Sequence, residues 1–112
     1  MEAVRASVMW DGPKSDIVTL FVEPTPEPWQ ADPDDEFEIV LLRVLDENEE
    51  ETDEIAGIEI IDFLEFNRWD DLPKVSFLWQ LPGWEPLPAD ELLKRVQHDF
   101  KVEAALLARH AG

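Results

Sequence analysis

Segments whose side chains divide between the two faces of a strand occupy much of the first two thirds of this 112-residue chain. Apolar and polar residues alternate in residues 3–10, where Val4, Ala6 and Val8 share one side with Trp10. Residues 36–46 carry apolar side chains on both faces, and residues 54–66 carry most of theirs on the face that also includes Asp62. A two-residue period is typical of β-strands with one buried face. Within a further predicted strand, 16–23, the positions from Ile17 to Val22 are all apolar or β-branched. The sequence therefore predicts about four strands, forming a mainly antiparallel sheet.

A helix is predicted over residues 88–110. Pro88 suits a first helical turn, and Asp90 and Glu91 complement the positive end of the helix dipole. Six apolar residues then fall on one stripe: Leu92, Leu93, Val96, Phe100, Ala104 and Leu107. Val102 and Leu106 widen this arc, either as a subunit contact or as ordinary surface aliphatics. We expect an α+β fold in a single domain, residues 1–112, with the helix covering one face of the sheet.

Two segments interrupt the regular pattern. Residues 24–35 contain four prolines among acidic residues. Because proline has no backbone N–H, so many prolines in a short segment predict an extended, polyproline-like loop. Residues 67–87 are rich in aromatic residues and prolines, and we expect an irregular connection containing one short helix or strand near residues 75–81. Residues 46–53 include no apolar side chain and predict a hairpin turn.

The negative charge is concentrated in the middle of the chain. Between Glu23 and Asp71 there are 19 acidic residues against Arg43 and Arg68, a net charge of −17 out of −18 for the whole chain. A localised field of this kind indicates a surface or loop with a role in recognition. The loop before the strand 36–46 and the tip after it should lie about 30 Å apart, at roughly 3.4 Å per residue. The charge therefore predicts two acidic ends rather than one compact patch.

Composition excludes several classes of protein. The chain has no cysteine, so disulfides and thiolate metal sites are excluded, and no secretory signal is seen, which favours the cytoplasm. The longest stretch without charge has 10 residues, too few to span a bilayer. The net charge opposes direct binding to nucleic acid or to anionic lipid.

No catalytic or metal-binding pattern is complete. Asp46, Asn48 and Glu50 match the first ligands of a calcium loop, but Glu51 and Gly57 stand where glycine and a bidentate glutamate are required. The spacing of His98 and His110 makes no zinc-binding pair. None of the serines lies in the glycine-flanked turn that exposes a catalytic serine, so the sequence indicates no nucleophile. We therefore expect neither an enzyme nor a cofactor, although Glu59 and Asp62 are the carboxylates that acid–base chemistry would use.

Two short stretches resemble a family of small uncharacterised bacterial proteins, a domain of unknown function with a Gly-Ile-Glu-Ile-Leu closing strand. Trp10-Asp11 with residues 16–20 is similar to the family's first hairpin, and residues 55–62 are similar to its closing strand. The resemblance covers about half of the chain. It implies a small sheet protein from bacteria and brings no known activity.

Two functional hypotheses follow. The first is an interaction module, such as an inhibitor, antitoxin or DNA mimic, that binds a basic protein partner through acidic residues of the middle region: Asp34, Asp35, Glu36, Asp46, Glu47, Glu49, Glu50, Glu51 and Asp53. The alternative is a domain that binds a small molecule or cation through Asp62, Trp69, Trp79 and Trp84. We also expect self-association, with a dimer as the simplest homo-oligomer.

Overall fold

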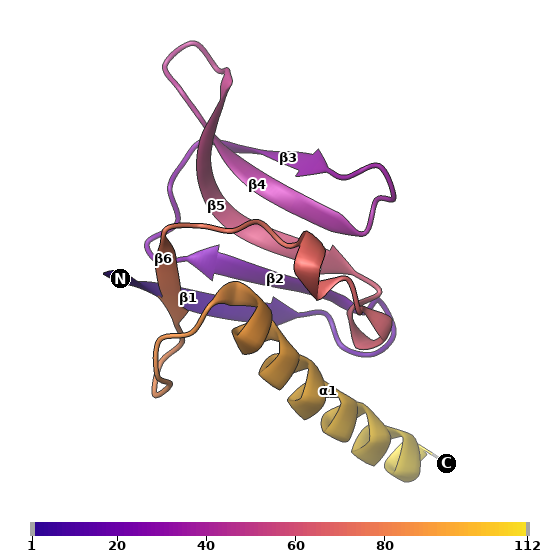
Figure 1. Ribbon diagram of the computed structural model, residues 1–112. Helices are drawn as coiled ribbons and strands as arrows, with labels where there is room; N and C mark the ends of the chain where they lie inside the picture. Colours follow the sequence, from indigo (N-terminus) through magenta and orange to yellow (C-terminus); the bar gives the residue numbers. More distant parts are fainter. Residues whose placement is uncertain (1, 112) are drawn as a thin grey trace.

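The computed structural model describes the backbone of residues 2–111 and side chains as far as Arg109, so His110 lies outside the described side chains. One six-stranded sheet carries a long C-terminal helix on one face (Figure 1). The strands are β1 (Glu2–Trp10), β2 (Ile17–Val22), β3 (Trp29–Pro33), β4 (Ile39–Leu45), β5 (Glu51–Ile61) and β6 (Phe77–Gln80). Two 3₁₀ turns, η1 (Phe63–Glu65) and η2 (Trp69–Asp71), precede β6, and α1 (Ala89–Ala111) ends the chain.

The predicted α+β class is confirmed, but the sheet is larger and mixed. Its order is β3-β4-β5-β2-β1-β6. The four predicted strands correspond to β1, β2, β4 and β5, which pair antiparallel, and the predicted helix 88–110 corresponds to α1. The prediction of about four, mainly antiparallel strands is only roughly right, because two further short strands lie in segments that were predicted to be largely irregular.

The first of these strands is β3, inside the predicted loop 24–35. It pairs with β4 on one side and lies at the edge of the sheet. An edge strand tolerates proline because one row of its backbone groups has no neighbour to bond. Pro28 precedes β3 and Pro33 is its last residue, so the prolines bound the strand instead of preventing it.

The second additional strand is β6, within residues 67–87. A short helix or strand was expected near residues 75–81, and the structure has a strand there that runs parallel to the first residues of β1. Trp79 also exchanges two backbone hydrogen bonds with Leu87, of 2.8 and 2.9 Å. The parallel partner is 75 positions away along the chain, taking Glu2 paired with Phe77, and local pattern carries no information on such a pairing.

The end of β5 also differs from the prediction. The predicted strand 54–66 ends at Ile61, and Asp62 adopts a left-handed conformation with φ of 56° before the η1 turn. Asp62 was placed on an apolar strand face, whereas the structure exposes it at the turn. A short polar residue tolerates this conformation better than its apolar neighbours would, so the chain reverses there and Phe63 enters the core.

The main core lies between α1 and the sheet. Leu92, Leu93 and Val96 of α1 pack over a layer of strand residues that includes Leu20, Ile58 and Ile60. The buried Gln97 attaches the helix to the η1 turn, because its Nε2 donates to the carbonyls of Phe63 (2.7 Å) and Phe66 (2.8 Å). Leu107 was expected in the same stripe but is 49% exposed, because the helix continues beyond the sheet.

A smaller apolar cluster occupies the other face of the sheet. It consists of Val40, Leu42, Val44 and Ala56, with Phe21 and Ile61 packed against it. Gly57 lies at the centre of this region, opposite Phe21 on β2 and Leu42 on β4. A Cβ at residue 57 would be 2.5 Å from the carbonyl oxygen of Leu20. The close approach of β2 and β5 therefore requires glycine.

Candidate functional site

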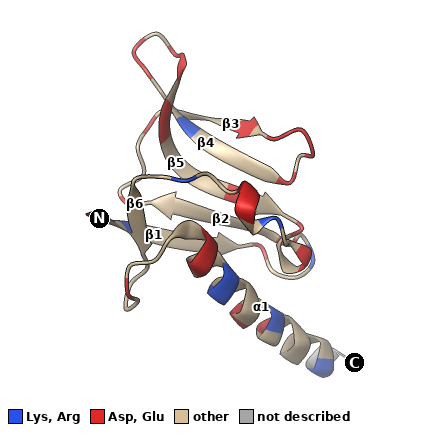
Figure 2. Ribbon diagram, viewed as in Figure 1, with Lys and Arg blue, Asp and Glu red and all other residues tan. Residues whose placement is uncertain are grey.

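The acidic residues of the middle region gather at both ends of β4 (Figure 2). The loop between β3 and β4 lies at one end, and the tip of the β4–β5 hairpin lies at the other. For the seven residues of β4, the span is about 24 Å at roughly 3.4 Å per residue. The arrangement agrees with two acidic ends, and they differ in how far their charge is neutralised.

The charge of the loop between β3 and β4 is partly neutralised by Arg68. Arg68 Nη1 donates to Asp34 Oδ2 (2.8 Å) and Glu38 Oε1 (3.1 Å) and lies 3.3 Å from Glu36 Oε2, while Nε donates to Asp71 Oδ2 (3.0 Å). These carboxylates, Asp34 first, raise the pKa of Arg68. One cation thus holds three acidic side chains of this loop and one of the η2 turn.

Asp34 organises the same loop through its backbone contacts. Its Oδ1 accepts hydrogen bonds from the N–H groups of Glu38 (3.0 Å) and Ile39 (3.3 Å). Burial acts to raise the pKa of Asp34, but the N–H of Glu38, the Arg68 guanidinium and the N–H of Ile39 outweigh it and hold this pKa below its ordinary value. Asp34 is therefore a structural carboxylate and a poor candidate for contact with a partner.

The hairpin tip is organised by Asp46, whose Oδ1 accepts the N–H groups of Asn48 (2.8 Å) and Glu50 (3.0 Å). Beside the tip, Arg43 Nε donates to Asp32 (2.6 Å) and lies 3.8 Å from Glu51. The other acidic side chains of the tip are exposed and, within the described side chains, take part in no ion pair: Glu47, Glu49, Glu50 and Asp53.

The predicted partner-binding residues thus fall into two groups. Asp34, Glu36, Asp46 and Glu51 hold the fold through ion pairs or turn hydrogen bonds. Asp35 and the four side chains named above stand in solvent. The sequence could not separate them, because Arg68 lies 34 positions from Asp34. Among the side chains that the structure describes, only those of the tip include more than two exposed acidic residues close together in the sequence.

The structure does not bring the predicted ligand-binding residues together. Trp79 is fully buried, and its Nε1 has no hydrogen-bond partner among the described residues. Trp69 lines a hollow of about 330 Å³ beside the start of α1. Trp84 lines a different, open hollow with Arg95, whose guanidinium carbon lies 5.9 Å from the indole centroid. Asp62 lines neither hollow.

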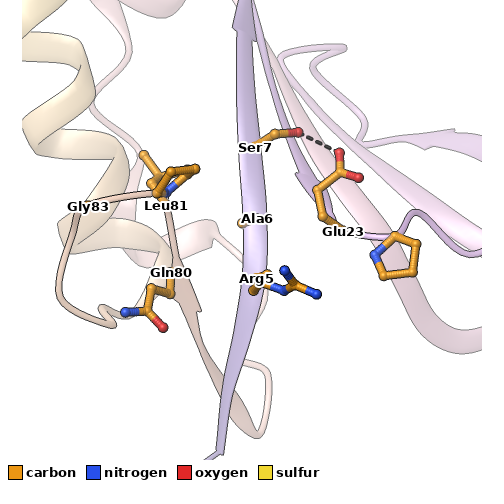
Figure 3. A pocket seen from close by; sticks show the side chains of 9 residues that line it. Arg5, Ala6, Ser7, Glu23, Gln80, Leu81 and Gly83 are labelled. Carbon is orange, nitrogen blue, oxygen red and sulfur yellow. Dashed lines mark hydrogen bonds between the residues drawn. The ribbon is translucent and has the colours of Figure 1, made fainter.

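A feature not predicted from sequence is a hollow of about 560 Å³ where β6 leaves β1 (Figure 3). Arg5, Ser7 and Glu23 lie on one side, and the segment from Gln80 to Gly83 lies on the other. Ser7 Oγ donates to Glu23 Oε1 at 2.7 Å. No local signal could find this hollow, because its walls come from distant parts of the chain.

None of the helices in the described part of the chain combines the length and apolarity needed to cross a membrane. Comparison of the chain with family models, with curated proteins and with solved structures gives no match. Functional inference therefore depends on the geometry of the chain itself.

Proposed function

We propose that this chain is an interaction module that binds a basic protein partner through the acidic tip of the β4–β5 hairpin. The observation that carries the proposal is the exposed set Glu47, Glu49, Glu50 and Asp53, which stands beyond the body of the sheet in Figure 1. Carboxylates that have no ion-pair partner and project on a hairpin attract a cationic surface from a distance. They keep their hydration shell until the partner is in contact.

The loop between β3 and β4 is the weaker candidate for this contact. Its carboxylates already share Arg68, so a partner would have to compete with a cation of the chain itself. Two separated acidic ends also favour an inhibitor-like or antitoxin-like contact over imitation of a continuous phosphate backbone. The proposed cytoplasmic location and the resemblance to small bacterial proteins fit such a role and stay predictions.

Titration with a labelled lysine-rich peptide tests the proposal. We expect binding that weakens steeply as salt rises, because the attraction is screened. Replacing Glu47, Glu49 and Glu50 by Gln and Asp53 by Asn should lower the affinity at least tenfold. Asp46 is kept because it holds the turn.

The matched control changes the same number of charges elsewhere: Glu2, Glu65 and Glu91 to Gln and Asp99 to Asn, all of which are exposed. If long-range attraction by net charge were the whole effect, both variants would lose affinity equally. Equal losses, or binding that is indifferent to salt, would refute the tip as the contact surface.

A further inference from the structure

The two edges of the sheet are built differently. β3 is short, contains Asp32 and is bounded by Pro28 and Pro33. Proline, charge and short length are the features by which proteins prevent other strands from pairing with an edge. At the opposite edge, β6 pairs with residues 2–5 of β1, and residues 6–10, Ala-Ser-Val-Met-Trp, carry neither charge nor proline. The edge formed by residues 6–10 of β1 therefore lacks the features that prevent pairing with another strand.

The register shows which backbone groups of β1 are free. Glu23 N–H donates to Arg5 (2.8 Å) and Asp11 N–H donates to Ile17 (3.1 Å), so the odd residues of β1 bond to β2. Successive residues of a strand direct their N–H and C=O groups to opposite sides. The backbone groups of Ala6, Val8 and Trp10 therefore point away from β2.

Proline ends the pairing that covers the start of this edge. The next bond of the β1–β6 ladder would join the N–H of residue 82 to the carbonyl of Ala6, and Pro82 has no N–H. Within residues 2–111, no hydrogen bond reaches the N–H or C=O of Val8 from β6 or from a side chain. The register with β6 gives the N–H of Ala6 to the carbonyl of Gln80, so the free groups are the carbonyl of Ala6 and the N–H and C=O groups of Val8 and Trp10. An extended backbone is the group that complements them.

The C-terminal part of α1 extends past the sheet on the side of this same edge (Figure 1). It presents Val102, Leu106 and Leu107, each 49% exposed. Met9, on the free part of β1, is 61% exposed. Half of the large apolar side chains that the described part of the chain exposes are thus on this helix end, beside an unpaired strand edge.

Charge identifies what could cover these surfaces. β1 has one acidic and one basic residue, and α1 has four of each, so both elements are neutral. The net charge of −17 between Glu23 and Asp71 belongs mainly to β3, β4, β5 and their loops, toward the other edge. A second copy approaching β1 meets a neutral surface, and its own acidic segments point outward.

We propose that two copies of this chain pair antiparallel through residues 8–10 of β1, about a two-fold axis at Met9. Val8 of each copy then exchanges two backbone hydrogen bonds with Trp10 of the other copy. An isologous contact requires a surface that complements itself, and two free, outward-pointing residues placed on either side of Met9 meet that requirement.

The same symmetry places both α1 helices on one face of the joined sheet. Each helix leaves its own sheet across β1 and passes over the second copy, so Leu107, which continues the stripe of Val96 and Phe100, becomes covered together with the neighbouring Leu106. The proposed dimer does not depend on the proposed tip contact, and the effect of salt concentration distinguishes the two. Screening weakens binding to a basic partner, but it strengthens a dimer of two chains that each carry −18.

Sedimentation analysis of the full chain across concentration and salt tests the proposal. We expect a species of twice 12.9 kDa that becomes more abundant as salt rises. Val8→Pro removes the outward N–H, which an edge position tolerates, and should raise the dimer dissociation constant at least tenfold. Leu106→Glu should do the same without altering the strand.

Two controls match these variants. Ala31→Pro removes an outward N–H from the β3 edge, and Phe37→Glu adds the same charge at an exposed residue of the β3–β4 loop; both should stay dimeric. If Val8→Pro loses its circular dichroism signal, Leu106→Glu decides the outcome. A monomer for the wild-type chain at hundreds of micromolar, or dimers of unchanged stability in both variants, would overturn the proposal.

Discussion

Gly57→Ala tests the close packing at the centre of the sheet, where two effects of opposite sign compete. Removing a glycine reduces the conformational freedom of the unfolded chain and alone would stabilise the protein by about 0.4–1 kcal/mol. The structure predicts the reverse. The new Cβ would lie 2.5 Å from the backbone oxygen of Leu20 and 3.2 Å from Cδ1 of Leu42.

The size of the stability loss follows from how far β2 and β5 must separate to accommodate the new Cβ. Carbon and oxygen atoms that pack favourably are about 3.3 Å apart or more, so β2 and β5 would have to separate by roughly 0.8 Å. Overpacking of this kind costs about 1–3 kcal/mol, and the upper part of that range applies because the obstructing atom is backbone. After the entropy gain, the net loss should be about 2 kcal/mol, or a fall of ~10 °C in the melting temperature.

Urea unfolding, followed by tryptophan fluorescence, measures this difference. Gly12 gives the matched control, because it has a φ of +88° and open space around it. Asn tolerates positive φ, so Gly12→Asn should change stability little, whereas Gly57→Asn should be worse than Gly57→Ala. A Gly57→Ala variant as stable as wild type, or more stable, would refute the close approach of β2 and β5.

Other predictions concern single contacts. Gln97→Leu should lower stability by about 2–4 kcal/mol, since two buried carbonyls lose their donor; a melting curve like wild type would count against this. Asp16→Ala should destabilise the first hairpin by about 2 kcal/mol, because Asp16 accepts the N–H of Leu64 at 2.9 Å, and fast amide exchange at residue 64 would show it. Arg68→Met should raise the pKa of Asp34, measured by NMR titration. Since this pKa is depressed, its stabilisation is present above the unfolded value near 3.9 and is lost as pH falls through the folded value, so the variant should differ from wild type most at neutral pH.

The predicted elements that the structure confirms are those with a strong local period. Residues 3–10 alternate and form β1, and the apolar stripe from Leu92 to Phe100 packs α1 on the sheet. The strand that was not predicted, β3, and the strand left undecided between helix and strand, β6, lack such a period. β3 is mostly exposed and proline-bounded, and β6 has four residues whose partner strand is at the other end of the chain.

In the candidate site, too, features made by neighbouring residues could be predicted, whereas contacts between distant residues could not. The acidic tip could be recognised because eight polar residues follow one another in the sequence. The pairing of Arg68 with Asp34 could not, since it depends on how the η2 turn approaches the β3–β4 loop. Likewise, the burial of Trp79 follows from a parallel pairing that no spacing of aromatic residues could indicate.

The pairing of β1 with β6 also affects how the protein is made. β1 leaves the ribosome well before its partner β6, which begins at Phe77, and before the helix that covers the core, which begins at Ala89. Long-range pairing of this kind delays folding until the distant partner is available. Nearly the whole chain must therefore be synthesised before the core can close, and during that time the apolar strand β2 is exposed to chaperones and to other nascent chains.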